Sequence, residues 1–274
     1  MVDDLSIDTG LVRKILTEFL RTEIGRAGFL HAVVNLSGGI DSAVSFALAA
    51  EALGPQNVLA VRLPYKTSST DSLEHAQQLI DQFGAPSVTI PITEMVDPLI
   101  ELDPQMPAMR KGNIMARARM IVAYDQSEAF KALVVGTGNK TEILLGYTTL
   151  YGDSACALNP IGDLYKTQVR QLARALNIPQ AIIAKPPSAD LWTGQTDEGE
   201  LGFTYEDVDK LLYLLVDQRY RPDECVEAGF GEKFGRKVVE RVRRNQFKRI
   251  LPPIAKLSSR TVGYDFLYLR DWGT

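Results

Sequence analysis

The stretch Ala32-Val33-Val34-Asn35-Leu36-Ser37-Gly38-Gly39-Ile40-Asp41-Ser42 decides the fold of this chain. Its first five residues form a short, mainly apolar run, which is typical of a strand buried on both faces of a sheet. Two glycines then turn the chain, and the Ala-rich residues 40–53 predict a helix that stops at Gly54-Pro55. The stretch therefore predicts a strand, a tight turn and a helix.

The same alternation continues on both sides of this unit. Residues 6–27 predict a helix before it. The segments after it are predicted strands at 58–63, 87–90 and 132–135 and predicted helices at 71–83 and 113–130. Strands that alternate with helices pair in parallel through right-handed crossovers. We therefore expect the α/β fold class, with a doubly wound, Rossmann-like parallel sheet and helices on both faces.

After about residue 150 the pattern becomes mainly helical, with predicted helices at 166–176, 205–216 and 232–245. We expect one domain over residues 1–274, with a sheet core at about 30–180 and a helical C-terminal part at 205–274. Between them, residues 185–204 are rich in Gly, Pro and polar residues. A loop of that length is usually functional or mobile, so this segment is a lid candidate, the alternative being an exposed connection.

Composition limits the classes of function. The 274 residues are 45% hydrophobic and 23% charged, as in ordinary globular proteins, and the net charge is -4. An acidic chain is a poor general binder of nucleic acid or of membrane surfaces. Cys156 and Cys225 are the only cysteines and do not form a CxxC pair. With no visible signal peptide and no apolar run that could cross a bilayer, a cytoplasmic protein is expected.

The loop after the first strand is suited to bind phosphate. Glycines let the backbone approach an anion, and the free amides and dipole at the start of the next helix favour negative charge. Ser37 and Ser42 add hydroxyl donors. Asp41 would repel a phosphate unless a cation lay between them, which predicts Mg2+ bridging Asp41 and the phosphates. The alternative is an ordinary turn in which Ser or Asp caps the helix.

A second phosphate-type segment follows the strand at 132–135. Gly136-Thr137-Gly138-Asn139-Lys140-Thr141 resembles a P-loop, but Asn139 stands where that motif needs a glycine. Glu142 is a candidate second Mg2+ ligand opposite Asp41, although a Glu taken alone at such a position is more often a helix-surface residue. Lys166 begins a predicted helix, where the dipole disfavours a cation, and this suggests that it serves an anion instead. The alternative for an isolated lysine, which normally wins, is a solvated surface charge.

The arginines leave alternatives open. Arg117 and Arg119 are two residues apart on one helix, so at most one is expected to face a site. The basic run from Arg241 to Arg249 could hold a dinucleotide or form a solvated helix face. Serine-hydrolase and HExxH metal-hydrolase motifs are absent from the sequence.

The SGGIDS loop after a strand resembles that of the N-type ATP pyrophosphatases, of the adenine nucleotide alpha-hydrolase fold, which activate acids by adenylation. Further segments narrow the resemblance to the NAD+ synthetases. They are residues 60–65, Lys111-Gly112-Asn113 with Ala116-Arg117, Gly136-Thr137 with Glu142, residues 151–153, residues 187–191 and Lys248-Arg249. These segments occur in the order of the family and span nearly the whole chain.

The resemblance implies ATP-dependent amidation of deamido-NAD+ through an acyl adenylate, with release of pyrophosphate and AMP. It implies that Asp41 and Glu142 ligate Mg2+ and that Arg117 and Lys248 contact deamido-NAD+. The implied ATP-binding residues are Ser37, Gly38, Gly39, Ile40, Asp41, Ser42, Arg62, Leu63, Thr137, Lys166 and Ser188. Lys166 would face the phosphates, and Arg62 and Leu63 would lie near the adenosine.

The resemblance also implies a homodimer with the dinucleotide site at the subunit interface. Free ammonia is the expected nitrogen donor, since the chain has no room for the glutaminase domain of glutamine-using relatives. Better-known bacterial members have Lys, Asp and His where this chain has Leu150, Ala157 and Phe247. Two alternatives remain: a pyrophosphatase that adenylates a purine nucleotide or tRNA, and a non-catalytic ATP-binding sensor.

Overall fold

The structure of the chain is a computed structural model that describes residues 5–188 and 196–267. Its sheet has four strands in the order β3-β2-β1-β4, and every pairing between neighbours is parallel. The strands are β1 (His31–Asn35), β2 (Val58–Arg62), β3 (Ser87–Thr89) and β4 (Ala132–Val135). The doubly wound parallel sheet predicted from the sequence is confirmed, with strand ends shifted by one residue or less.

Alternate residues of the strands build two separate cores, one on each face of the sheet. Ala32 and Val34 of β1 pack into the core that holds α2, whereas Val33 packs with Val61 of β2 into the opposite core. All of these side chains are buried. Because side chains alternate across a strand, β1 and β2 need apolar residues at consecutive positions to be covered on both faces.

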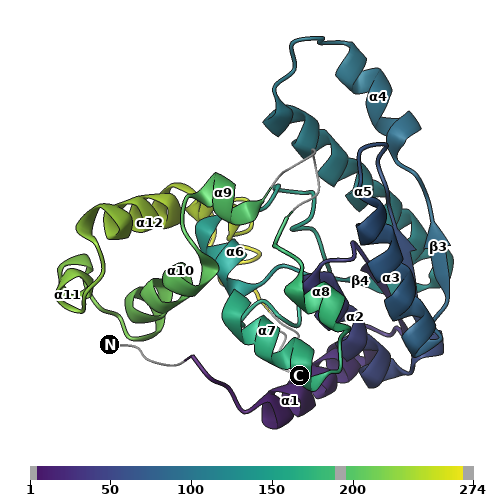
Figure 1. The fold of residues 1–274 in the computed structure, drawn as a ribbon, viewed down its shortest axis with the longest axis horizontal. Helices are drawn as coiled ribbons and strands as arrows, with labels where there is room; N and C mark the ends of the chain where they lie inside the picture. The colour runs from purple at the N-terminus through teal and green to yellow at the C-terminus, as the bar shows by residue number, and fades with distance from the viewer. Residues whose placement is uncertain (1–4, 189–195, 268–274) are drawn as a thin grey trace.

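Helices cover the two faces unequally (Figure 1). The first face carries α1 (Thr9–Arg26), α2 (Ile40–Leu53), α3 (Thr70–Phe83), α7 (Lys166–Ala175) and α8 (Gln180–Ala184). The second face carries α4 (Thr93–Glu101) and α5 (Ala108–Phe130). The short η1 (Pro55–Asn57) follows Gly54, which ends α2 with a positive φ of 83° as the Gly-Pro stop predicted.

The helical C-terminal part packs around a third core beside the sheet, on the left in Figure 1. Tyr205, Leu211 and Val238 are among its buried residues, and Leu145 joins it from the sheet side. Its elements are α6 (Lys140–Leu145), α9 (Asp197–Leu201), α10 (Tyr205–Leu212), the π-helical turn η2 (Tyr213–Asp217), α11 (Pro222–Glu227), α12 (Glu232–Arg244) and η3 (Gln246–Lys248). The helix predicted at 205–216 is therefore an α-helix that ends at Leu212 and continues as a π-turn.

The lid candidate at 185–204 is only partly a loop. Residues 189–195, which include part of the family-like segment 187–191, lie outside the described residues. The residues on either side come together, because the backbone amide of Asp197 donates to the carbonyl of Pro187 at 2.9 Å. Thr196 then caps the short helix α9, which the sequence analysis missed. Among the described helices, none is both long and apolar enough to cross a membrane.

Candidate active site

A cavity of about 1140 Å³ opens at the carboxyl ends of β1, β2 and β4. This is the edge where open α/β sheets bind ligands. The predicted site residues that line it are Ser37, Gly39, Ile40, Asp41, Ser42, Arg62, Leu63, Thr137, Glu142, Lys166, Ser188 and Lys248. Residues from strand ends, α5, α7 and α12 thus meet around one space, which exceeds the usual size for a single small ligand.

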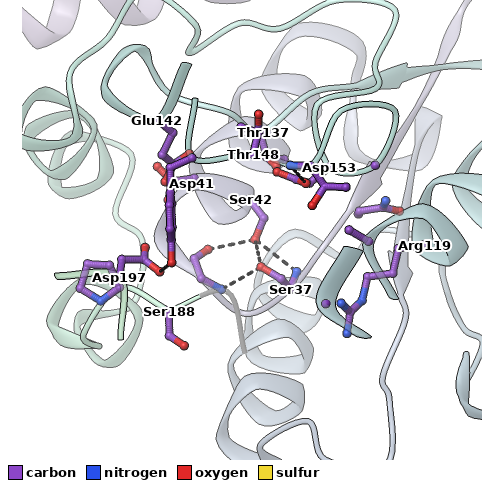
Figure 2. Close-up of a pocket in the computed structure, with 18 of the residues that line it drawn as sticks. Ser37, Asp41, Ser42, Arg119, Thr137, Glu142, Thr148, Asp153, Ser188 and Asp197 are labelled. Carbon is purple, nitrogen blue, oxygen red and sulfur yellow. Dashed lines mark hydrogen bonds between the residues drawn. The ribbon is translucent and has the colours of Figure 1, made fainter. Parts of the chain in front are cut away.

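The loop between β1 and α2 is held in one shape. Gly38 has a φ of +77°, and a Cβ placed there would come within 2.1 Å of the backbone oxygen of Ser72. Only glycine fits, although Gly38 itself does not line the cavity. The hydroxyl of Ser42 donates to the carbonyl of Gly39 at 2.9 Å and accepts from the amide of Ser37 at 3.2 Å. Figure 2 shows these bonds at the centre of the site.

The start of α2 has no side-chain cap, since its N-cap residue is Gly39. The first amides of this helix therefore remain as donors, together with the positive end of the helix dipole. The sequence alternative in which Ser or Asp caps the helix is not what the structure shows. An anion fits this helix start better than a capping side chain does.

Lys166 is the charged centre of the site and is only 2% exposed. Its Nζ lies 2.5 Å from Oδ2 of Asp41 and 3.1 Å from Oε1 of Glu142, and 5.0 Å from the ring centre of Tyr205. Burial by itself lowers the pKa of Lys166, but the two carboxylates outweigh that effect and the net pKa is raised. The lysine therefore stays charged and joins three segments that are far apart in the sequence.

Asn139 fixes the two carboxylates relative to each other. Its amide Nδ2 donates to Oδ1 of Asp41 at 2.9 Å, and its Oδ1 accepts from the backbone amide of Glu142 at 3.0 Å. The backbone amide of Asn139 donates back to Oε2 of Glu142 at 3.4 Å, which completes a capping box on α6. The residue that ruled out a P-loop thus has a role in this arrangement.

Glu142 is not the helix-surface residue of the alternative interpretation. Burial raises the pKa of Glu142 to about 8, the charges of Asp41 and Asp197 add to the rise, and Lys166 opposes it. In Figure 2, Asp41, Glu142 and Asp197 lie together on one side of the site. We call the loop 37–42 with Glu142 and Lys166 the phosphate wall.

Asp197 is a site residue that the sequence analysis missed. It lies on α9, is buried, lines the cavity and accepts from the hydroxyls of Tyr147 at 3.2 Å and Tyr205 at 3.0 Å. Burial raises the pKa of Asp197, while Lys166 and the two tyrosine hydroxyls act in the opposite direction. No spacing rule links this Asp to residue 41 or 142, so only the packing of α9 against the cavity reveals it.

A second missed residue, Asp209, connects the helical part to the phosphate wall. Its buried carboxylate accepts from the hydroxyl of Thr141 at 2.6 Å and from the backbone amide of Thr167 at 2.8 Å. Thr141 in turn accepts from the backbone amide of Lys166 at 3.0 Å. Asp209 thereby holds α6 and the start of α7 together, and with them the segments that carry Glu142 and Lys166.

The opposite side of the cavity is built from the segment 146–155 together with Arg119 and Lys248, and we call it the far wall. Lys248 donates to the carbonyls of Gly146 at 2.8 Å and Thr148 at 2.7 Å. Burial lowers the pKa of Lys248, and Asp153 acts in the opposite direction. Lys248 therefore supports the backbone of this wall as well as lining the cavity.

Of Arg117 and Arg119 on α5, the structure directs Arg119 to the cavity. Arg119 donates from Nε to the carbonyl of Leu63 at 3.1 Å and lines the space in Figure 2. Arg117, which was expected to contact the dinucleotide, does not line the cavity of the single chain and donates to the carbonyl of Leu150 at 3.2 Å. Two residues rotate a helix by roughly 200°, so the two side chains point apart.

The three positions where this chain departs from better-known members also lie off the cavity lining. They are Leu150, Ala157 and Phe247, and the Phe247 side chain is 56% exposed. The two residues expected near adenosine do line the cavity. Arg62 is held by a bond from Nη1 to Oε1 of Gln77 at 2.6 Å, and Leu63 supplies the carbonyl that holds Arg119.

The donor set of the phosphate wall suits Mg2+ bound together with phosphate. Asp41 and Glu142 offer hard carboxylate oxygens around one point, now bridged by the Lys166 ammonium. Among residues 5–188 and 196–267, no group of three or more His, Cys, Asp or Glu forms a complete metal cage. Mg2+ is typically held by one or two carboxylates plus substrate phosphates, so these residues fit the ion.

The fold and the site together define an α/β nucleotide-binding protein of the adenine nucleotide alpha-hydrolase type. Residues 12–252 match the family model described as NAD synthase. The chain is 54% identical to an NH(3)-dependent NAD(+) synthetase of Chlorobaculum parvum over 98% of this chain and 97% of the relative. It is 47% identical to an NH(3)-dependent NAD(+) synthetase of Fusobacterium nucleatum over 93% and 99%. The chain belongs to the NAD synthase family.

Solved structures agree with this membership. An NMN synthetase from Francisella tularensis matches with a TM-score of 0.82 and 30% identity, over 92% of this chain and 100% of that one. An NH3-dependent NAD synthetase from Campylobacter jejuni matches with a TM-score of 0.78 and 32% identity, over 91% and 100%. The fold expected from the resemblance is therefore confirmed over nearly the whole chain.

Proposed function

We propose that this protein converts deamido-NAD+, ATP and ammonia into NAD+, AMP and pyrophosphate. The observation that carries the proposal is the buried Lys166 paired with the partly buried Asp41 and Glu142, beside an uncapped helix start at the carboxyl edge of the sheet. A sensor that only bound ATP would have no need for two partly buried carboxylates around a lysine. The relatives' name, NH(3)-dependent NAD(+) synthetase, supports ammonia as the nitrogen donor and NAD+ as the product.

In the first step, the nicotinate carboxylate attacks the α-phosphorus of ATP. A P–O bond forms to the carboxylate, the bond to the β-phosphate breaks, and pyrophosphate leaves. The loop amides and the hydroxyl of Ser37 would bind phosphate oxygens, the hydroxyl of Ser42 holds the loop in shape, and Lys166 is the cation beside them. Such fixed donors lower the barrier because they stabilise charge at phosphorus without having to reorganise.

Asp41 and Glu142 would hold Mg2+ together with the phosphates. When bound, the ion would neutralise negative charge on the phosphate oxygens and favour departure of pyrophosphate. Asn139 holds the two carboxylates in fixed positions relative to each other. Asp209 holds the helices that carry Glu142 and Lys166 in place. The protein's own residues therefore orient the reacting groups and neutralise charge on the phosphates.

In the second step, ammonia attacks the carbonyl carbon of the acyl adenylate, the bond to AMP breaks, and the nitrogen loses a proton as the amide forms. Asp197 lies on the same side of the cavity as Asp41 and Glu142, and its carboxylate would receive a cationic or proton-donating nitrogen species.

The far wall and the exposed face of α5 are proposed to take the dinucleotide in a homodimer. Arg117, Ile121 and Tyr124 follow one another at helical spacing on one face of α5, and Ile121 and Tyr124 are 56% and 41% exposed. Apolar side chains beside an arginine are typical of protein–protein interfaces. Arg117 would then reach a substrate between two subunits, and light scattering after size exclusion tests the dimer.

Pyrophosphate release provides the test of the reaction. Purified protein with Mg-ATP is expected to release pyrophosphate only when deamido-NAD+ is added, and NAD+ is expected to form once ammonium is supplied. If pyrophosphate is released with a purine nucleotide or a tRNA and not with deamido-NAD+, the proposed adenylation stands and deamido-NAD+ is refuted as the substrate. No release with any acid would favour the ATP sensor.

The same assay distinguishes a mononucleotide acid from the dinucleotide. The structure from Francisella tularensis carries the description NMN synthetase, so nicotinate mononucleotide is the competing acid to be compared. The curated relatives with 54% identity are described as NAD(+) synthetases, which favours deamido-NAD+ for this chain. A higher kcat/KM with the mononucleotide would reverse that choice.

A further inference from the structure

Lys166 occupies the position between the two carboxylates that the proposed function assigns to a metal ion. Its Nζ contacts Asp41 at 2.5 Å and Glu142 at 3.1 Å, and the side chain is almost entirely buried. The carboxylates are held around it by Asn139, which bonds to the side chain of Asp41 and to the backbone of Glu142. The ammonium thus fills the same role that a divalent cation would fill.

The electrostatics of this arrangement oppose metal binding by the chain alone. The negative charges of the partly buried Asp41 and Glu142 would repel each other without a cation, and the lysine already offsets part of that repulsion. A free divalent ion would have to enter beside a positive charge or displace it. Removal of the lysine from its partners would in turn cost free energy unless another anion accepted it.

We propose that Lys166 keeps the metal site closed until ATP binds, and that metal and nucleotide therefore load together. The phosphates of ATP are the anion that can accept the ammonium, which frees Asp41 and Glu142 for the ion. This inference rests on the proposed function for its nucleotide and its metal. A lysine suits this exchange because its compact charge sits on a long flexible stem.

The fixed frame around the lysine supports this exchange. The backbone of Lys166 is tied down by its amide, which donates to Thr141, and by Asp209 at the next residue. The loop 37–42 begins α2 without a side-chain cap, so its donors stand ready beside Asp41. The ammonium can therefore change partners while the helix that carries it stays in place.

The experiment measures Mn2+ binding without nucleotide, with the signal of free Mn2+ in electron paramagnetic resonance as the readout. We expect wild-type protein to bind Mn2+ weakly and Lys166→Met to bind one ion per chain roughly tenfold more tightly or better, because a buried like charge has been removed. Lys166→Gln is the second variant, which removes the charge and keeps a polar group. Asp41→Asn added to either variant is expected to abolish the gain.

Lys140→Met is the matched control. Lys140 also bridges two carboxylates, Asp217 at 2.7 Å and Asp163 at 3.0 Å, and also lies over a tyrosine ring, that of Tyr165 at 4.8 Å. It does not line the cavity. This variant is expected to bind Mn2+ no better than wild type. The comparison distinguishes a metal-binding position at Lys166 from a general effect of losing a paired lysine.

A measurement on wild type alone keeps the inference testable if the lysine variants do not fold. Mg2+ without nucleotide is expected to leave Tm unchanged, and Mg2+ with a non-hydrolysable ATP analogue is expected to raise it. An equal rise with Mg2+ alone, or tight Mn2+ binding by wild type, would overturn the inference. So would folded lysine variants that gain no affinity. These outcomes leave pyrophosphate release with deamido-NAD+ untouched, so they are distinct from failure of the proposed reaction.

Discussion

The two walls of the cavity are built in different ways. In the phosphate wall, charged side chains bond to one another: Lys166 to Asp41 and Glu142, and Asn139 to Asp41. In the far wall, the cations bond mainly to backbone carbonyls, as Lys248 does to Gly146 and Thr148 and Arg119 does to Leu63. The first wall is a preformed charge network, and the second is a shaped backbone surface.

This difference predicts how much change each wall tolerates. A network in which each charge compensates another tolerates little change, because loss of one partner leaves a buried charge unpaired. A wall held by bonds to backbone carbonyls depends less on the side chains of its segment, such as that of Leu150. The phosphate wall is therefore expected to set whether the reaction occurs, and the far wall to set how tightly the acid binds.

The sharpest test of the comparison is Asp41→Asn. We expect kcat for pyrophosphate release to fall by roughly 10³-fold, because the substitution removes a proposed metal ligand and a partner of Lys166 at the reacting phosphates. Far-UV circular dichroism should show a retained fold. Asp163→Asn is the control, since Asp163 is an exposed carboxylate that pairs with Lys140 outside the cavity. Activity of D41N within a few-fold of wild type would refute the metal role.

A second test changes the shape of the phosphate wall without changing its charge. Gly38→Ala is expected to lower kcat/KM for ATP by roughly 100-fold, because the new Cβ would collide with the backbone of Ser72 and displace the loop. The positive φ adds about 1–2 kcal/mol of strain. Gly84→Ala separates the two causes, as Gly84 has a φ of +64° and open space around its Cβ. Gly84→Ala should lower Tm and leave kcat/KM for ATP unchanged.

The far wall is tested by Lys248→Met. Loss of the bonds to Gly146 and Thr148 is expected to raise KM for the acid substrate about tenfold, a little over 1 kcal/mol, and to leave KM for ATP nearly unchanged. Steady-state kinetics with each substrate varied in turn give both constants. Arg243→Gln, on α12 outside the cavity lining, is the control. A larger effect on ATP than on the acid would contradict the division between the walls.

The smallest expected effect is on stability with pH. The pKa of Glu142 is raised to about 8 in the folded protein, so between its ordinary value and pH 8 the folded state holds a proton that the unfolded chain has lost. This carboxyl therefore stabilises the folded state most below its ordinary pKa, and that contribution is lost progressively as pH rises to about 8. Urea unfolding at several pH values gives the free energy of unfolding of wild type and of Glu142→Gln. The two free energies should agree at acidic pH and differ near pH 8. The same pH dependence in both proteins would exclude the raised pKa.

Much of the fold could be predicted from local sequence. The apolar run at 32–36 and the Gly-Pro stop at 54–55 gave β1 and α2 within a residue, because both signals act within one element. The helices α4, α6, α8, α9 and α11 were missed, and α5 begins at Ala108 where the pattern had suggested residue 113. α4 even contains Pro98, so local propensity was overruled there by packing against α5.

The sequence by itself determined the anion loop, the carboxylates at residues 41 and 142 and the lysine at 166, since these depend on residue types at the ends of local elements. Only the tertiary structure decided that Lys166 meets Asp41, 125 residues away, and that Asp197 and Asp209 join the site. It also selected Arg119 over Arg117 for the cavity. The reason is physical: spacing fixes which residues share an element, whereas the packing of elements fixes which charges are brought together and buried.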